Sequence, residues 1–182
     1  MTNPLAAIRY GRLSIGLHWL MLLLIAAVYA LMEFRGYFPK GSATREAMKL
    51  WHYMLGLSVL ALVLVRIAAR FASPTPAIVP APAAWQALAA RAAHLALYLF
   101  MLCMPVVGWV LLNAEGHVAP FFGLELPALV AKDHALAEAT EDLHKTIGTV
   151  GYWLLGQHAA AALFHHYVVK DNTLRRMLPG RD

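Results

Sequence analysis

Four long stretches of the chain are almost free of charged side chains, and they constrain the fold more than any other feature. We expect them to form helices over residues 13–34, 48–71, 85–112 and 142–169. A bilayer core is crossed by about 20 mostly apolar helical residues. Backbone polar groups that face lipid must be paired within their own helix. The sequence therefore predicts a single domain, residues 1–182, folded as an all-α integral membrane four-helix bundle.

The composition agrees with a chain that lies largely in lipid. Of the 182 residues, 60% are hydrophobic and 14% are charged, whereas a soluble domain usually has about 25% charged residues. The net charge is +5, but the basic residues flank the apolar stretches, which is typical of membrane proteins. We therefore expect membrane lipid around the chain and no nucleic-acid partner. The single cysteine, Cys103, excludes an internal disulfide and a covalent Cys-x-x-Cys-His attachment of haem.

Three links connect the apolar stretches, and their compositions differ. Residues 73–82 contain four prolines, which predict an extended linker. Residues 34–49 contain glycine and proline at positions that favour turns. Residues 113–142 form the longest link, and we expect a short surface helix over 132–142.

The distribution of Lys and Arg predicts the orientation in the membrane. With four helices, both termini share one side with the link that joins the second and third helices. That side holds nine basic residues: Arg9, Arg12, Arg66, Arg70, Arg91, Lys170, Arg175, Arg176 and Arg181. The other side holds six: Arg35, Lys40, Arg45, Lys49, Lys132 and Lys145. Because Lys and Arg favour the cytoplasmic side, we expect both termini in the cytoplasm.

Histidines inside the apolar stretches are the main functional signal. Ionisable residues in membrane helices are costly and usually have a function. His144 and His158 are 14 residues apart, so on a helix they lie within about 40° of the same face and about 21 Å apart along the axis. A single metal ion cannot bridge this distance. The spacing instead suits two stacked haems, one near each membrane surface.

Each haem then needs a second histidine at the same depth. His52 lies at the start of the second helix and His144 at the start of the fourth, and both helices begin on the outer side. His18 lies early in the first helix, which begins on the inner side, and His158 lies in the inner half of the fourth. Depth therefore predicts the pairs His52 with His144 and His18 with His158.

Glycines near these histidines fit the same interpretation. Gly56 follows His52 by four residues, and Gly148 follows His144 by four. A residue four positions along lies one turn away on the same helix face, where a flat macrocycle needs empty space. Gly151 lies midway between the two histidines of the last helix, where two macrocycles would come closest. This pattern is compatible with bis-histidine haem.

Two structural alternatives remain for these histidines. A lone histidine in a membrane helix often makes a hydrogen bond between helices, and this is the better interpretation of His94. A zinc site would usually add a nearby cysteine or carboxylate, which the predicted pairs lack. The sequence assigns no role to His117, His134 or His166.

Several segments together resemble the prokaryotic cytochrome b561 family, and in particular its superoxide oxidase (superoxide:ubiquinone oxidoreductase) branch. They are residues 15–19 (IGLHW), 32–39 (MEFRGYFP), 158–167 (HAAAALFHHY) and 170–176 (KDNTLRR), together with His52. The resemblance implies two haem b groups within the bundle, ligated by the same four histidines. It also implies a bacterial inner-membrane enzyme that oxidises superoxide at the periplasmic face and transfers electrons to ubiquinone, with no obligate protein partner.

Two further sets of residues are candidates for this reaction. Lys40, Arg45 and Lys49 precede His52 in the first outer link, and such a local basic patch could steer the superoxide anion. The alternative is that they are ordinary solvated loop charges. His165 lies two turns after the last predicted haem ligand and could deliver protons to quinone.

The sequence alone leaves two other functions open. A cytochrome b subunit would pass electrons between quinone and a partner such as a hydrogenase, formate dehydrogenase or thiosulfate reductase, although the short loops offer little docking surface. A non-redox membrane protein would use its histidines for packing or metal handling.

Overall fold

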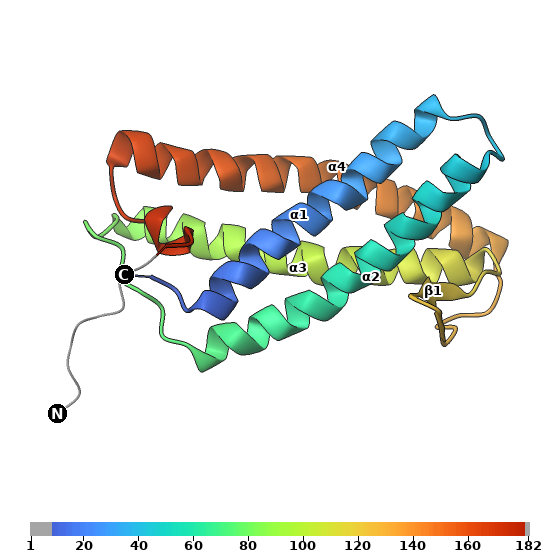
Figure 1. The fold of residues 1–182 in the computed structure, drawn as a ribbon, viewed down its shortest axis with the longest axis horizontal. Helices are drawn as coiled ribbons and strands as arrows, with labels where there is room; N and C mark the ends of the chain where they lie inside the picture. The colour runs from blue at the N-terminus through green and yellow to red at the C-terminus, as the bar shows by residue number, and fades with distance from the viewer. Residues whose placement is uncertain (1–8, 181–182) are drawn as a thin grey trace.

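A computed structural model describes residues 9–180, and four long helices dominate it (Figure 1). They are α1 (Arg12–Phe34), α2 (Ala43–Ala72), α3 (Ala84–Ala114) and α4 (His134–Phe164). Shorter elements are η1 (Arg35–Tyr37), β1 (Ala119–Phe121), β2 (Leu124–Leu126), η2 (His165–Val169) and η3 (Arg175–Met177).

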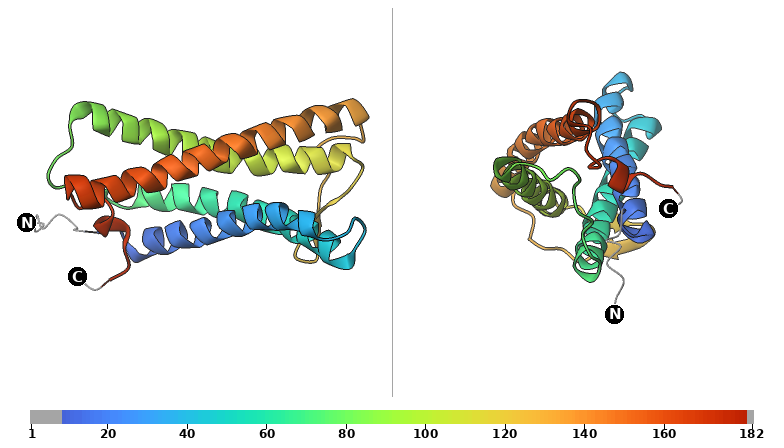
Figure 2. Two further views of the ribbon diagram at one scale, coloured as in Figure 1. Left: turned by 90° about the horizontal axis from the view of Figure 1, so that it is seen from above. Right: turned by 90° about the vertical axis from the view of Figure 1, so that its left-hand side faces the viewer.

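The long helices form two packed hairpins. Figure 2 shows α1 beside α2 and α3 beside α4, and α2 also contacts α3. Met21 and Ile25 of α1 are buried against Val59 and Val63 of α2. We call the end where α1 begins and α2 ends the inner end, and the opposite end, with η1 and the β-hairpin, the outer end.

Three of the four helices have the length and composition of membrane spans. They are Arg12–Tyr37, which includes η1, Ala43–Ala72 and Ala84–Ala114. The outer third of α4 carries several charged residues, so this helix is less apolar than the others. The chain is therefore mostly helical and membrane-integral.

The fourth helix begins earlier than we expected. The sequence predicts a separate surface helix over 132–142, but this segment is the first part of α4. The Asp133 side chain accepts a hydrogen bond from the Leu136 backbone N–H at 3.1 Å and caps the helix. No glycine or proline interrupts residues 134–144, so the helix continues without a break into the apolar stretch.

A small β-hairpin between α3 and α4 is the second unexpected element. β1 and β2 pair in antiparallel register, with Ala119 opposite Leu126. Ala119 is 1% exposed and belongs to an apolar cluster with Leu57 of α2 and Leu112 of α3. The hairpin thus covers the outer end of these two helices.

After α4, the chain turns back over the inner end. Lys170 has a positive φ of 59° and ends the π-helical turn η2. Trp19 of α1 donates a hydrogen bond to the Met177 carbonyl at 2.7 Å. Asn172 accepts one from the Val79 N–H at 2.9 Å, within the non-helical proline-rich link. The segment therefore ties α1, α4 and that link together.

Candidate haem sites

The structure brings four of the predicted histidines together in two pairs. His18 of α1 lies beside His158 of α4, with ring centroids 6.1 Å apart and ring planes at 71°. His52 of α2 lies beside His144 of α4, with centroids also 6.1 Å apart and planes at 72°. The first pair is at the inner end and the second at the outer end. One helix therefore contributes to both pairs, with nearly identical geometry.

This spacing fits an iron ion between two imidazoles. Histidine nitrogens bind first-row metals at about 2 Å, so two rings on opposite sides of one iron have centroids about 6 Å apart. The structure contains no cluster of three or more His, Cys, Asp or Glu able to hold a metal ion within residues 9–180. The arrangement therefore suits haem, which supplies the four equatorial ligands itself, better than zinc.

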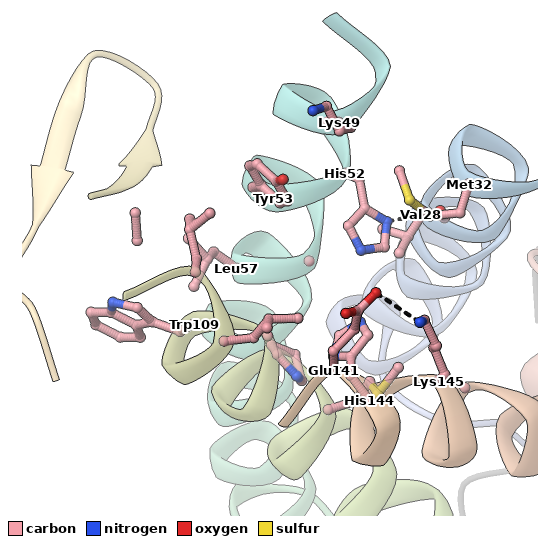
Figure 3. Close-up of a pocket in the computed structure, with 18 of the residues that line it drawn as sticks. Val28, Met32, Lys49, His52, Tyr53, Leu57, Trp109, Glu141, His144 and Lys145 are labelled. Atoms are coloured by element: carbon pink, nitrogen blue, oxygen red, sulfur yellow. Dashed lines mark hydrogen bonds and ion pairs between the residues drawn. The ribbon is translucent and has the colours of Figure 1, made fainter. Parts of the chain in front are cut away.

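The outer pair is oriented by its surroundings. His52 Nδ1 lies 3.1 Å from the Val28 carbonyl oxygen. A carbonyl only accepts hydrogen bonds, so Nδ1 carries the proton and Nε2 is free to bind a metal. His144 Nδ1 is buried, and we find no hydrogen-bond partner for it within residues 9–180. Figure 3 shows both side chains at the same pocket, with the contact between His52 and Val28 dashed.

A cavity of about 1050 Å³ lies beside this pair. Its size is sufficient for a large cofactor. All four helices contribute to its walls, among them Tyr53 of α2 and Trp109 of α3. A Cβ placed on Gly56 would meet no atom within 4 Å, whereas one on Gly108 would lie 3.0 Å from the His144 ring. Gly56 thus leaves space beside His52, and Gly108 leaves space for the ring of His144.

The expectation for Gly151 is wrong. The sequence places it where two macrocycles approach each other, but a Cβ there would collide with the Tyr29 hydroxyl and the Phe100 ring. Tyr29 donates a hydrogen bond to the Gly148 carbonyl at 2.7 Å. Gly151 therefore permits close packing of aromatic side chains from α1 and α3 between the two sites.

The inner pair has two neighbours that the sequence interpretation did not assign to it. His94 of α3 lies with its ring centroid 5.7 Å from that of His158. Arg66 Nη2 lies 3.3 Å from His18 Nδ1. Each is an ionisable residue in an otherwise apolar helix, and this signal could have marked both as parts of a site.

The predicted basic patch is only partly assembled at the cavity. Lys49 lines the cavity and pairs with Glu46 at 2.5 Å. Arg45 instead donates to the Phe38 carbonyl at 3.0 Å and stabilises the turn between α1 and α2. Lys40 is exposed in that turn. Arg35, Lys132 and Lys145 also line the cavity, but Glu33, Glu115, Glu138 and Glu141 line it too. Lys145 pairs with Glu141 at 2.7 Å.

His165 forms an ion pair that the sequence did not reveal. Its Nδ1 lies 2.5 Å from Asp171 Oδ2, and the Asp171 side chain is 1% exposed. Burial alone would raise the pKa of Asp171, but hydrogen bonds from His165 and from Thr173 outweigh it and hold this pKa below its usual value. The positive φ at Lys170 brings the carboxylate back to the histidine.

Long apolar helices that hold paired histidines between them define the class of helical membrane cytochromes. The chain belongs to the prokaryotic cytochrome b561 family, whose sequence profile matches residues 9–180. The resemblance seen in the sequence is therefore confirmed. Members of this family bind haem b and transfer electrons within the membrane.

Individual relatives cover nearly the whole chain. Cytochrome b561 homolog 1 of Escherichia coli (strain K12) is 41% identical over 173 residues, which are 95% of this chain and 98% of the relative. A Yersinia pestis protein named "Probable superoxide oxidase CybB" is 37% identical over 173 residues, 95% and 97% of the two chains. Cytochrome b561 homolog 2 of Escherichia coli (strain K12) is 31% identical over 178 residues, 93% and 91% of the two chains.

Proposed function

We propose that this chain is a superoxide:ubiquinone oxidoreductase with two haem b groups, held in the bacterial inner membrane by four spanning helices with both termini in the cytoplasm. Two superoxide anions each lose one electron and become dioxygen at the periplasmic face. One ubiquinone takes up those two electrons and two protons and becomes ubiquinol. The observation that carries the proposal is the pair of histidine sites with equal geometry at two depths. The name of the Yersinia pestis relative supports superoxide as the donor.

In this proposal each histidine pair binds one haem iron, His18 with His158 and His52 with His144. The haems, when bound, supply one-electron carriers at two depths of the membrane. The protein contributes ligation, orientation and insulation. The Val28 carbonyl fixes the ring of His52, Gly56 leaves room beside it, and the side chains of Tyr29 and Phe100 pack against Gly151 between the two sites.

The decisive experiment uses the chain purified without any partner. Superoxide generated enzymatically should reduce the haem absorption bands, and added ubiquinone should reoxidise them with formation of ubiquinol. Catalase as an additive controls for hydrogen peroxide. If the chain reacts with quinone but not with superoxide, it is instead a cytochrome subunit that receives electrons from a partner dehydrogenase. The redox character of the family argues against a non-redox membrane protein.

We infer that superoxide is attracted by the positive charges near the outer cavity. Neutralising Lys40, Arg45 and Lys49 together should slow haem reduction by superoxide roughly tenfold at low ionic strength, because a basic patch raises the encounter rate of an anion. The salt dependence of this rate should also become flatter. Stopped-flow absorbance measures both effects. A triple variant with the parent's rate and salt dependence would exclude a role of these residues in attracting superoxide. The single variant Lys49→Gln tests the lysine at the cavity wall separately.

We infer that His165, paired with Asp171, delivers protons to quinone. Asp171 remains ionised at neutral pH because its pKa is lowered, so its carboxylate can accept a hydrogen bond from His165 Nδ1 and hold the imidazole ring in place. We expect His165→Ala to slow haem reoxidation by quinone roughly 100-fold, within the usual range for a general acid. Asp171→Asn should slow it less, and reduction by superoxide should not change in either variant.

A matched control separates proton delivery from docking of the C-terminal segment. Asn172 anchors the same segment to the proline-rich link by hydrogen bonds with Ala77 and Val79, and none of its hydrogen bonds within residues 9–180 involves His165. Asn172→Ala should therefore retain the parent's rate of haem reoxidation. If it slows reoxidation as much as Asp171→Asn does, the ion pair serves docking only.

A further inference from the structure

Arg66 is a charged residue in the apolar part of α2, next to the inner histidine pair. It is half-buried, and its Nη1 donates a hydrogen bond to the Ser14 carbonyl at 3.3 Å. Within residues 9–180, no carboxylate lies within 4.0 Å of its guanidinium group. A cation inside a membrane protein is costly unless an anion or several acceptors compensate it. Its charge therefore lacks an anionic partner among the residues that the structure describes.

The second contact of Arg66 is incompatible with iron bound to His18. Arg66 Nη2 lies 3.3 Å from His18 Nδ1, and a guanidinium group can only donate hydrogen bonds. If iron binds Nε2, then Nδ1 carries a proton and faces Arg66 donor to donor. If iron binds Nδ1, its lone pair is no longer available to Arg66. In either case Arg66 must find another acceptor when the inner site is filled.

We propose that this acceptor is a propionate carboxylate of the inner haem. The inference rests on the proposed function, because it assumes that His18 and His158 ligate haem. Haem carries two carboxylates, and an arginine binds a carboxylate with paired, charge-assisted hydrogen bonds. The inner site would thus bind its haem in two ways: His18 and His158 would bind the iron, and Arg66 would bind a carboxylate.

Arg70 and Arg176 differ from Arg66 because their hydrogen bonds do not involve the predicted haem ligands. Arg70 donates to the Tyr10 hydroxyl at 3.1 Å and lies over the Tyr10 ring, 5.5 Å from its centroid. Arg176 donates to the Pro76 carbonyl. Neither hydrogen bond involves His18, so ligation of iron by His18 does not remove its acceptor. Arg66 therefore differs from both, because its contact with His18 Nδ1 is lost when His18 binds iron.

The test is an optical redox titration of the full-length, haem-loaded protein. Removing a nearby positive charge favours the more positively charged ferric state. In Arg66→Gln, the ratio of reduced to oxidised inner haem at a fixed potential should fall about tenfold, a downward shift of ~59 mV for a one-electron couple. The outer haem should keep its potential. Arg66→Lys should remain close to the parent, as should the control Arg91→Gln, because Arg91 is exposed near the start of α3.

A second measurement covers the case in which Arg66→Gln releases the inner haem. The full-length chain is loaded with haem or with its dimethyl ester, which lacks both carboxylate charges. Esterification should weaken binding at the inner site of the parent about tenfold and have little further effect in Arg66→Gln. Equal weakening in the two proteins would overturn the inference.

Different results would overturn the proposed function and the role of Arg66. A parent protein without an inner haem would overturn the proposed function together with this inference. Two haems at the parent's potentials in Arg66→Gln would overturn only the role of Arg66.

Discussion

Replacing His158 by alanine is expected to halve the haem content of the purified protein, from two haems per chain to one. The reason is that we assign His158 and His18 to the iron of the inner haem. Their ring centroids lie 6.1 Å apart, which is the spacing expected for two histidines that bind one iron. His18→Ala should lose the same haem. His52→Ala and His144→Ala should each lose the other one. Pyridine haemochrome analysis gives the stoichiometry, and low-temperature spectra identify which haem remains.

The pairing itself is tested by comparing the four variants. Variants within a pair should have matching residual spectra, and variants from different pairs should not. His94→Ala is the control, because His94 lies 5.7 Å from His158 but is not assigned to iron. Retention of two haems with unchanged spectra in His52→Ala or His158→Ala would exclude the proposed ligation. Loss of the inner haem in His94→Ala, with retention in His18→Ala, would replace His18 by His94 as the ligand.

Placing a leucine at position 56 is expected to remove the outer haem while the helices remain intact. A side chain at Gly56 meets open space in this structure, and that space adjoins His52 on the same face of α2, one turn away. Because the space is open, leucine should not strain the fold, and its apolar side chain suits a membrane helix. The leucine side chain would instead occupy the space beside His52 that the haem macrocycle needs. Haem content should fall towards one per chain, with the inner haem's spectrum preserved.

Gly156 provides a matched control for this substitution. A Cβ at Gly156 also meets no atom within 4 Å, but it lies two residues before His158, about 160° around the helix from it. Gly156→Leu should therefore retain both haems, and circular dichroism should show the parent's helix content in both variants. Loss of haem from both variants to the same extent would attribute the effect to helix packing.

The helices and the depth of the histidines follow from local sequence. Long apolar stretches must satisfy their backbone groups internally in lipid, and this constraint predicts α1, α2 and α3 without knowledge of their neighbours. The number of residues between His144 and His158 sets their separation along α4 and their common face. Given antiparallel helices, depth alone then indicates which histidines can meet.

Two elements differ from the sequence-based expectation, one because a helix cap was overlooked and one because distant segments make contact. The segment over 132–142 joins α4 because Asp133 caps it and nothing breaks the helix behind it. The β-hairpin forms because Ala119 can be buried against Leu57 and Leu112, which are far away in sequence. The hairpin contact has no signature within a short window of sequence, whereas the Asp133 cap is a local signal that the interpretation of this segment did not use.

The sequence by itself determined a helical membrane protein, its family, and the histidines that can share a depth, since helix formation and ligand spacing depend on local geometry. Only the tertiary structure decided which groups surround those histidines. It brought Val28 to His52, Arg66 to His18, His94 to His158 and Asp171 to His165. The first three contacts join different helices, and the fourth requires the chain to reverse at Lys170. Their formation depends on packing and on one backbone turn, neither of which the spacing of residues along the chain specifies.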